Sequence, residues 1–229
     1  MTNTNLATRL TGIKATIQQI EAKYQRTKGS VTLLAVSKTK PIEAILQAVA
    51  VGQREFGESY LQEALEKIPL LVNEKLCWHF IGPIQKNKTK SIAENFGWVH
   101  SVDRAITAER LSKQRPKDLS PLQVCIQVNV DNEDSKSGVS LNDVENLANN
   151  IKTLPNIVLR GLMAIPSNTH DTTKQRHSFA QLRKKLDQLN TNGFNLDTLS
   201  MGMSNDLEPA IAEGATIVRV GSAIFGQRN

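Results

Sequence analysis

The sequence has few cysteines, few aromatic residues and no long apolar run. Its two cysteines, Cys77 and Cys125, stand in apolar segments, where a small buried thiol is a more common role than a disulfide. We therefore exclude a disulfide-stapled secreted domain and expect a reducing, cytoplasmic location. The longest apolar stretches, such as residues 31–36, are far shorter than the roughly 18 residues that mark a membrane-spanning helix. The sequence predicts a soluble protein with no membrane partner.

Charge and composition permit several kinds of ligand without choosing one. The 28 Lys and Arg residues exceed the 22 Asp and Glu residues by six, and this balance suits anions from small phosphates to nucleic acid. A nucleic-acid-binding barrel stays an alternative, although aromatic residues make up only 4% and no stacking platform or groove-reading motif is recognisable. The hydrophobic fraction of 39% suffices for a core, and we expect residues 1–229 to form a single domain.

The first twenty residues carry Arg9, Lys14 and no acid, a composition that transit peptides share. Their apolar residues, however, recur at spacings of four and three, as on the buried stripe of a helix packed on a core. We expect a structural helix whose buried face is formed by Leu6, Leu10, Ile13, Ile17 and Ile20.

Beyond that helix, short runs rich in β-branched residues alternate with longer helical segments. The expected strands are residues 31–37, 54–57, 78–82, 98–102, 122–130, 157–165, 198–201 and 217–225. The expected helices are residues 41–51, 60–68, 86–95, 104–113, 141–153, 173–190 and 206–213, with Ser140 as a candidate N-cap. This alternation predicts an α/β fold, a single (β/α)8 TIM-type barrel in which the N-terminal helix completes the outer ring.

In such barrels the carboxyl ends of the strands and the loops after them build the active site. Lys38 directly follows the first expected strand, so its amine stands at this end. A lysine after a strand is usually solvated. An amine partly withdrawn from water, however, is a better nucleophile toward an aldehyde and therefore a candidate for Schiff-base chemistry.

The loop after the seventh strand, residues 200–206, contains hydroxyl groups and a glycine where a helix begins. Exposed amides, the hydroxyl of Ser204 and the close backbone approach that Gly202 allows are typical of an anion-binding loop. The alternative is an ordinary helix start stabilised by Asp206 and Glu208. These two carboxylates would repel a phosphate if they pointed toward it.

The eighth strand places Arg219 and Gly221 on the face opposite Val218 and Val220. Burying a guanidinium without a partner is costly, so Arg219 should pair with a carboxylate or meet a ligand. Beyond it, Gly221 and Ser222 offer amide and hydroxyl donors beside those of the seventh strand, and barrels often bind phosphate at this place.

Other constellations are weaker. Cys77 and His79 are a conceivable metal pair, but no further Cys/His cluster supplies the remaining ligands, and we expect no metal. We interpret His79 as a hydrogen-bonded residue near the barrel mouth. The candidate serines, Ser37, Ser200 and Ser204, have no recognisable His/Asp pairing for nucleophilic catalysis.

An ordered set of motifs along the chain carries a resemblance. The motifs are LLAVSKTK at 33–40, WHFIG at 78–82 with Gln85, Asn87 and Lys88 after it, SKSG at 135–138, RGLMAI at 160–165, LSMGMS at 199–204 and RVG at 219–221. Here the sequence strongly resembles the pyridoxal 5'-phosphate homeostasis protein family, single-domain proteins similar to the N-terminal barrel of alanine racemase.

The resemblance implies a site for pyridoxal phosphate. It implies that Lys38 forms the Schiff base with the cofactor, that Arg219 faces the pyridine nitrogen and that Met163 lines the ring pocket. Lys136 is implied as a secondary lysine near the mouth. The residues implied around the phosphate are Ser200, Ser204, Gly221 and Ser222. One position departs from the family pattern, since the common asparagine after residues 56–58 is Ser59 here, and this puts a ring contact in doubt.

The resemblance also implies a role. The protein would carry pyridoxal phosphate reversibly and contribute to intracellular vitamin B6 and amino-acid homeostasis, with apo-enzymes as recipients of the cofactor and a monomer as its expected state. An arginine opposite the pyridine nitrogen disfavours protonation of that nitrogen and weakens the electron sink, so we expect no efficient catalysis. The alternative is a pyridoxal-phosphate-dependent amino-acid racemase or related enzyme. Because the chain ends at Asn229, we expect it to lack the β-domain with which alanine racemases supply an opposing base.

Overall fold

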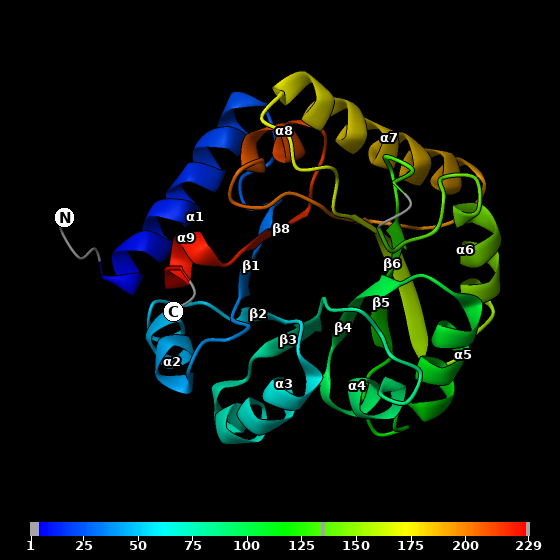
Figure 1. Ribbon diagram of the computed structural model, residues 1–229, viewed down its shortest axis with the longest axis horizontal. Coiled ribbons are helices and arrows are strands. Elements are labelled where there is room, and N and C mark those ends of the chain that lie inside the picture. Colours follow the sequence, from blue (N-terminus) through cyan, green and yellow to red (C-terminus); the bar gives the residue numbers. More distant parts are fainter. Residues whose placement is uncertain (1–4, 134–135, 228–229) are drawn as a thin grey trace.

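The computed structural model describes residues 5–133 and 136–227. Its strands form a closed barrel in sequence order, with every neighbouring pair parallel. Figure 1 shows the strands as an inner ring with the helices around it. The strands are β1 (Thr32–Val36), β2 (Glu55–Glu58), β3 (Cys77–Phe80), β4 (Trp98–Val102), β5 (Leu122–Val128), β6 (Ile157–Ala164), β7 (Thr198–Ser200) and β8 (Ile217–Val220). The predicted barrel is confirmed.

The helices follow the strands as the periodicity predicts. They are α1 (Leu6–Lys23), α2 (Ile42–Ala50), α3 (Leu61–Lys67), the 3-10 helix η1 (Pro69–Glu74), α4 (Thr89–Asn95), α5 (Ala105–Gln114), α6 (Val144–Lys152), α7 (Thr172–Thr191), α8 (Leu207–Ala212) and α9 (Ser222–Phe225). The predicted N-terminal helix is α1, which buries Leu6, Leu10, Ile17 and Ile20. It lies beside α8 and α9, closing the outer ring (Figure 1).

Several element boundaries differ from the sequence prediction by one or more residues, and hydrogen bonds explain two of the larger differences. The last strand ends at Val220, and the apolar residues after it form α9, because the amides of Ile224 and Phe225 both donate to the carbonyl of Gly221. Helix α6 begins at Val144 instead of residue 141. Ser140 does not cap it, because its hydroxyl bonds to the side chain of Asp143 and closes a turn first.

Large apolar side chains fill the space between the strands and the helices. Phe56, Phe80 and Phe96 are almost fully buried, and the rings of Phe80 and Phe96 meet edge to face at 5.3 Å. Such packing fixes the wall of the barrel. Because all strands run the same way, the residues that follow them gather at one end, which we call the mouth. In the described part of the chain, no helix combines the length and apolar character that crossing a bilayer requires.

Candidate functional site

A cavity of about 600 Å³ opens at the mouth. Residues that follow β1, β2, β6, β7 and β8 line it, together with the loop after β5. Every predicted cofactor residue except Ser200 is in the lining, namely Lys38, Met163, Ser204, Arg219, Gly221 and Ser222. Lys136 and Ser59 also line it. The structure therefore brings together side chains that are up to 184 positions apart in the sequence, from Lys38 to Ser222.

The turn that carries Lys38 is held by hydrogen bonds on both sides. The amide of Lys40 donates to the carbonyl of Ser37 at 3.0 Å, and the amide of Thr39 donates to Oε1 of Glu63 at 2.7 Å. Thr39 adopts a φ of 63°, a left-handed conformation that a β-branched residue rarely takes. The turn is thus forced into shape by its bonds, and it presents Lys38 to the cavity.

A buried ion pair lies behind this turn, between the barrel wall and α3. Lys67 Nζ is 3.1 Å from Oε1 of Glu58 and 2.9 Å from the carbonyl oxygen of Ser37, and it also pairs with Glu63. The hydroxyl of Ser37 donates to Glu58 at 2.7 Å. Burial raises the pKa of Glu58, although Ser37 and Lys67 act against the shift. Glu58 thus faces the helix layer and supports the lysine turn from outside.

Arg219 is buried in the barrel and borders the cavity. Its guanidinium donates to the carbonyl oxygen of Ser200 at 2.6 Å, to the hydroxyl of Ser200 at 2.8 Å and to the carbonyl of Ala164 at 2.9 Å. Within the described residues its guanidinium thus bonds to backbone and hydroxyl oxygens, whereas the sequence predicted either a carboxylate or a ligand as its partner. Burial lowers the pKa of Arg219 to about 10, with Asp206 opposing the shift, so the group stays cationic at neutral pH.

Ser200 lies beneath the cavity, outside its lining. It is completely buried, and its hydroxyl is 2.7 Å from Nδ1 of His100 and 2.8 Å from the guanidinium of Arg219. A histidine partner for this serine was not recognisable in the sequence, because His100 is a hundred positions away and meets it only across the closed barrel. Bonded on both sides, Ser200 is placed to support Arg219.

The loop after β7 has the shape that Gly202 allows. This glycine has a φ of 93°, and a Cβ at its position would come within 2.5 Å of the Cβ of Ala210. Ser204 follows it in the cavity lining. The carboxylate of Asp206 accepts a bond from the amide of Met203, and burial raises the pKa of Asp206. Glu208 turns to α1, where it accepts from Lys23 and Tyr24, and so does not point into the cavity.

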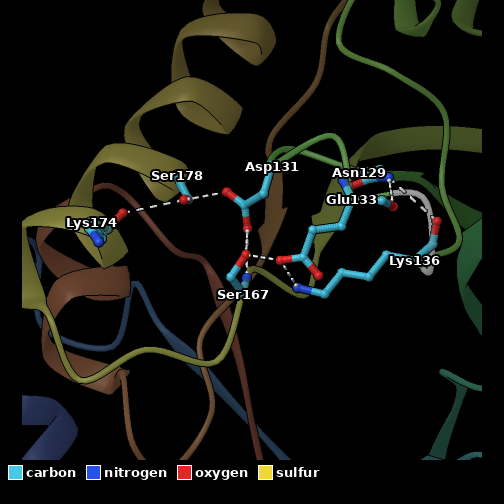
Figure 2. Close-up of polar contacts among 7 residues, drawn as sticks. All are labelled: Asn129, Asp131, Glu133, Lys136, Ser167, Lys174 and Ser178. Atoms are coloured by element: carbon cyan, nitrogen blue, oxygen red, sulfur yellow. Dashed lines mark hydrogen bonds and ion pairs between the residues drawn. The ribbon is translucent and has the colours of Figure 1, made fainter.

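A second polar network, drawn in Figure 2, includes Ser167 and Lys136, which also line the cavity. Ser167 donates through its amide and hydroxyl to Asp131, at 2.6 and 2.7 Å, and its hydroxyl also bonds to Glu133. Glu133 pairs with Lys136 at 3.2 Å. Burial would raise the pKa of Asp131, but bonds from Ser178 and Ser167 outweigh it and lower the pKa. The network ties Lys136 to the loops after β5 and β6. Ser135, which precedes Lys136 in the SKSG motif, lies outside the described residues.

The sequence suggested that His79 lies near the mouth, but the structure places its ring toward the opposite end of the barrel, where the strands begin. Its Nε2 is 2.7 Å from Oε2 of Glu55, the first residue of β2, and 3.4 Å from Sγ of Cys77, the first residue of β3. Glu55 supplies a third donor atom within 4.8 Å that the sequence did not place beside this pair. His79 bonds to both Glu55 and Cys77, and burial raises the pKa of the Cys77 thiol.

Comparison with known proteins agrees with this geometry. The family model described as alanine racemase, N-terminal domain, matches residues 9–229. The alanine racemase of Corynebacterium glutamicum shares the fold with a TM-score of 0.72 at 16% identity, over 96% of this chain and 62% of that one. Fold and mouth thus define a barrel of the alanine racemase N-terminal class.

Closer relatives narrow the assignment. A protein of Pseudomonas aeruginosa named pyridoxal phosphate homeostasis protein is 55% identical over 224 residues, which cover 98% of this chain and 96% of that protein. PipY of Synechococcus elongatus, solved with pyridoxal phosphate bound, is 35% identical with a TM-score of 0.84 and covers 97% of this chain and 100% of PipY. The chain belongs to the pyridoxal phosphate homeostasis protein family.

Proposed function

We propose that residues 1–229 form a single unit that binds pyridoxal phosphate at the mouth, holds it reversibly as a Schiff base on Lys38 and serves intracellular vitamin B6 and amino-acid homeostasis. The observation that carries this proposal is the joint position of Lys38, Arg219 and Ser222 around one cavity. The bound cofactor in the structure of PipY supports it.

The residues of the cavity fit the chemistry of this cofactor. A phosphate needs several donors, and the hydroxyls of Ser204 and Ser222 stand in the lining. Gly221 lets the chain after β8 lie close to β1, since a Cβ there would approach the carbonyl oxygen of Val36 to 3.3 Å. Met163 adds an apolar face for a ring.

The covalent step assigned to Lys38 is a condensation. The amine nitrogen of Lys38 attacks the aldehyde carbon, a carbon–nitrogen double bond replaces the carbon–oxygen bond, and water leaves. Hydrolysis reverses the step, which suits a protein that takes up and releases its cargo. The hydrogen bonds on both sides of Lys38 limit the freedom of the backbone that carries it.

Arg219 argues against efficient catalysis. A cationic guanidinium opposite the pyridine nitrogen makes its protonation costly, and an unprotonated ring is a poorer electron sink. The racemase alternative is supported by the shared fold alone. Incubation of the loaded protein with amino acids in D₂O distinguishes the non-catalytic carrier from the racemase. For the carrier we expect exchange of the amino-acid α-proton near the rate that free pyridoxal phosphate supports. Many turnovers per protein molecule would favour the racemase.

Borohydride trapping tests the lysine. The apo-protein is mixed with pyridoxal phosphate and reduced, and the modified lysine is mapped by mass spectrometry. We expect the main adduct on Lys38 and its loss in Lys38→Ala. Lys40→Ala is the matched control, because Lys40 also lines the cavity but donates to the carbonyl of Gln227. A main adduct on Lys40 or Lys136 would refute the assignment.

Three further predictions accompany the proposal. Apo-enzymes are expected to receive the cofactor, the protein is expected to be a monomer, and its location is expected to be cytoplasmic.

For the nucleic-acid-binding alternative, we expect no tight binding of an oligonucleotide. Tight binding whose affinity falls steeply with salt concentration would restore this alternative.

A further inference from the structure

A chain of hydrogen bonds runs through the interior of the barrel from its base to the mouth. Glu55 Oε2 is 2.7 Å from His79 Nε2, and His79 Nδ1 is 2.8 Å from His100 Nε2. His100 Nδ1 is 2.7 Å from Ser200 Oγ, which lies 2.8 Å from the guanidinium of Arg219. We call these five residues the interior chain.

The interior chain crosses the barrel instead of following its wall. It draws on β2, β3, β4, β7 and β8, and β4 and β7 are not neighbours in the closed barrel, so the bond between His100 and Ser200 spans the lumen. The four inner members are at most 5% exposed, whereas the side chain of Glu55 is 35% exposed at the base. Trp98 stacks on His79 with ring centroids 5.4 Å apart and helps to exclude water.

Counting protons fixes the direction of every bond. Arg219 can only donate, and an ionised Glu55 can only accept. Burial would raise the pKa of Glu55, but the bond from His79 outweighs it and lowers the pKa, so this carboxylate is ionised at neutral pH. Burial also lowers the pKa of His79, and burial together with the proximity of His79 and Arg219 lowers the pKa of His100 well below its usual value. Each imidazole therefore carries one proton.

With one proton on each ring, a single order leaves no clash. His79 donates from Nε2 to Glu55, His100 donates from Nε2 to Nδ1 of His79, and the hydroxyl of Ser200 donates to Nδ1 of His100. The oxygen of Ser200 then has its lone pairs toward Arg219. In the reverse order the lone pair of His79 Nε2 would face the carboxylate at 2.7 Å, and the hydroxyl proton of Ser200 would have no acceptor within the interior chain.

We propose that Glu55, acting through the interior chain, is a positioning residue for Arg219. The carboxylate at the base fixes the tautomers of both histidines, and the second histidine fixes the Ser200 hydroxyl that receives the guanidinium. The base of the barrel is thereby coupled to the charge that borders the cavity. Its effect on a bound cofactor rests on the proposed function; the proton order does not.

The proton order is tested on the apo-protein by ¹⁵N NMR of the histidine rings at pH 7.5. We expect single neutral tautomers with the proton on Nε2 for His79 and His100. The exposed His170 and His177 serve as internal references with averaged shifts. A proton on Nδ1 of either buried ring, or averaging like that of the references, would overturn the inference whether or not the protein binds pyridoxal phosphate.

The coupling is tested with Glu55→Ala, and Glu94→Ala is the control, a carboxylate of similar exposure on α4 that pairs with Lys90. We expect Glu55→Ala to abolish the single tautomer, to shift the absorption spectrum of the bound cofactor and to weaken its binding about fivefold or more. Ser200→Ala, which breaks the last link, should shift the spectrum in the same direction. An unshifted spectrum in Ser200→Ala would refute the coupling. If Glu55→Ala does not fold, the spectrum of Ser200→Ala and the histidine tautomers of the wild-type protein decide the question.

Discussion

Lys67 and Glu58 form an ion pair that is almost completely buried behind the turn of Lys38, with Nζ and Oε1 3.1 Å apart. The pair is tied to this turn, because Lys67 donates to the carbonyl of Ser37 and Ser37 donates to Glu58. A buried pair of this kind costs desolvation when it forms, but removing one partner leaves an uncompensated charge. It therefore serves to define the shape of the turn more than to add stability.

Lys67→Ala is expected to reduce the free energy of unfolding by about 3–5 kcal/mol, because Glu58 loses its counter-charge inside the protein. Urea denaturation measures this. Lys90→Ala, which removes an exposed partner of Glu94, should have little effect. If both variants unfold at the same urea concentration, the ion pair does not have the role described here.

Gly202→Ala should destabilise the fold and weaken cofactor binding. The new methyl group meets Ala210 at 2.5 Å and the residue must keep a φ of 93°, which together cost about 2–3 kcal/mol. Gly193→Ala is a matched control, since Gly193 has a φ of 84° but open space around it and should lose only about 1 kcal/mol. Thermal unfolding and cofactor titration compare the two. Equal losses would show that the contact with Ala210 is relaxed at no cost.

Arg219→Lys is not expected to be a conservative change. A lysine cannot reproduce the fork that reaches both Ser200 and Ala164, so at least one buried oxygen loses its donor, at about 1–3 kcal/mol. The spectrum of the bound cofactor should also shift. A variant with wild-type stability and an unchanged spectrum would show that Arg219 neither supports the barrel nor faces the ring.

Stability should fall as the pH drops from 7.5 to 5.5. The pKa values of His79 and His100 are lowered by burial, so the unfolded chain, with values near 6.5, binds more protons than the folded protein below that pH. Each histidine contributes a slope of about 1.4 kcal/mol per pH unit inside its window. The raised pKa values of Glu58 and Asp206 act in the opposite direction, but their windows start from ordinary values near 4, below this pH range.

Urea denaturation at several pH values measures this slope, and His100→Gln should make it shallower. The exposed His170 supplies a control, since His170→Gln should leave the slope unchanged. A flat profile between pH 7.5 and 5.5 would mean that the buried rings gain no protons on unfolding.

The barrel and most of the candidate site could be predicted from the sequence because both depend on local patterns. Alternating strand and helix periods indicate the barrel, and parallel strands bring their ends together, which placed Lys38 and Ser222 at one mouth. Position along a strand also identified Arg219 as an interior residue. Its partners were less predictable, because a carbonyl oxygen carries no signal in the sequence.

Features that depend on closure of the barrel were not predictable in this way. His100 and Ser200 meet only when β4 and β7 face each other across the lumen, and His79 was placed at the wrong end because the register against Glu55 was unknown. The end of β8 was misjudged for a simpler reason. Ile224 and Phe225 are as apolar as a strand, and only hydrogen bonds to Gly221 turn them into a helix.

The polar lumen also constrains how this barrel can change. In a lumen filled with hydrocarbon, each side chain can be exchanged for another of equal volume. Here, replacing one imidazole or the serine would leave the hydrogen-bonding groups of its neighbours without partners. We therefore expect the five positions of the interior chain to change together among homologues or to stay unchanged. Redesign of the residues at the mouth would therefore also require matching changes at the base of the barrel.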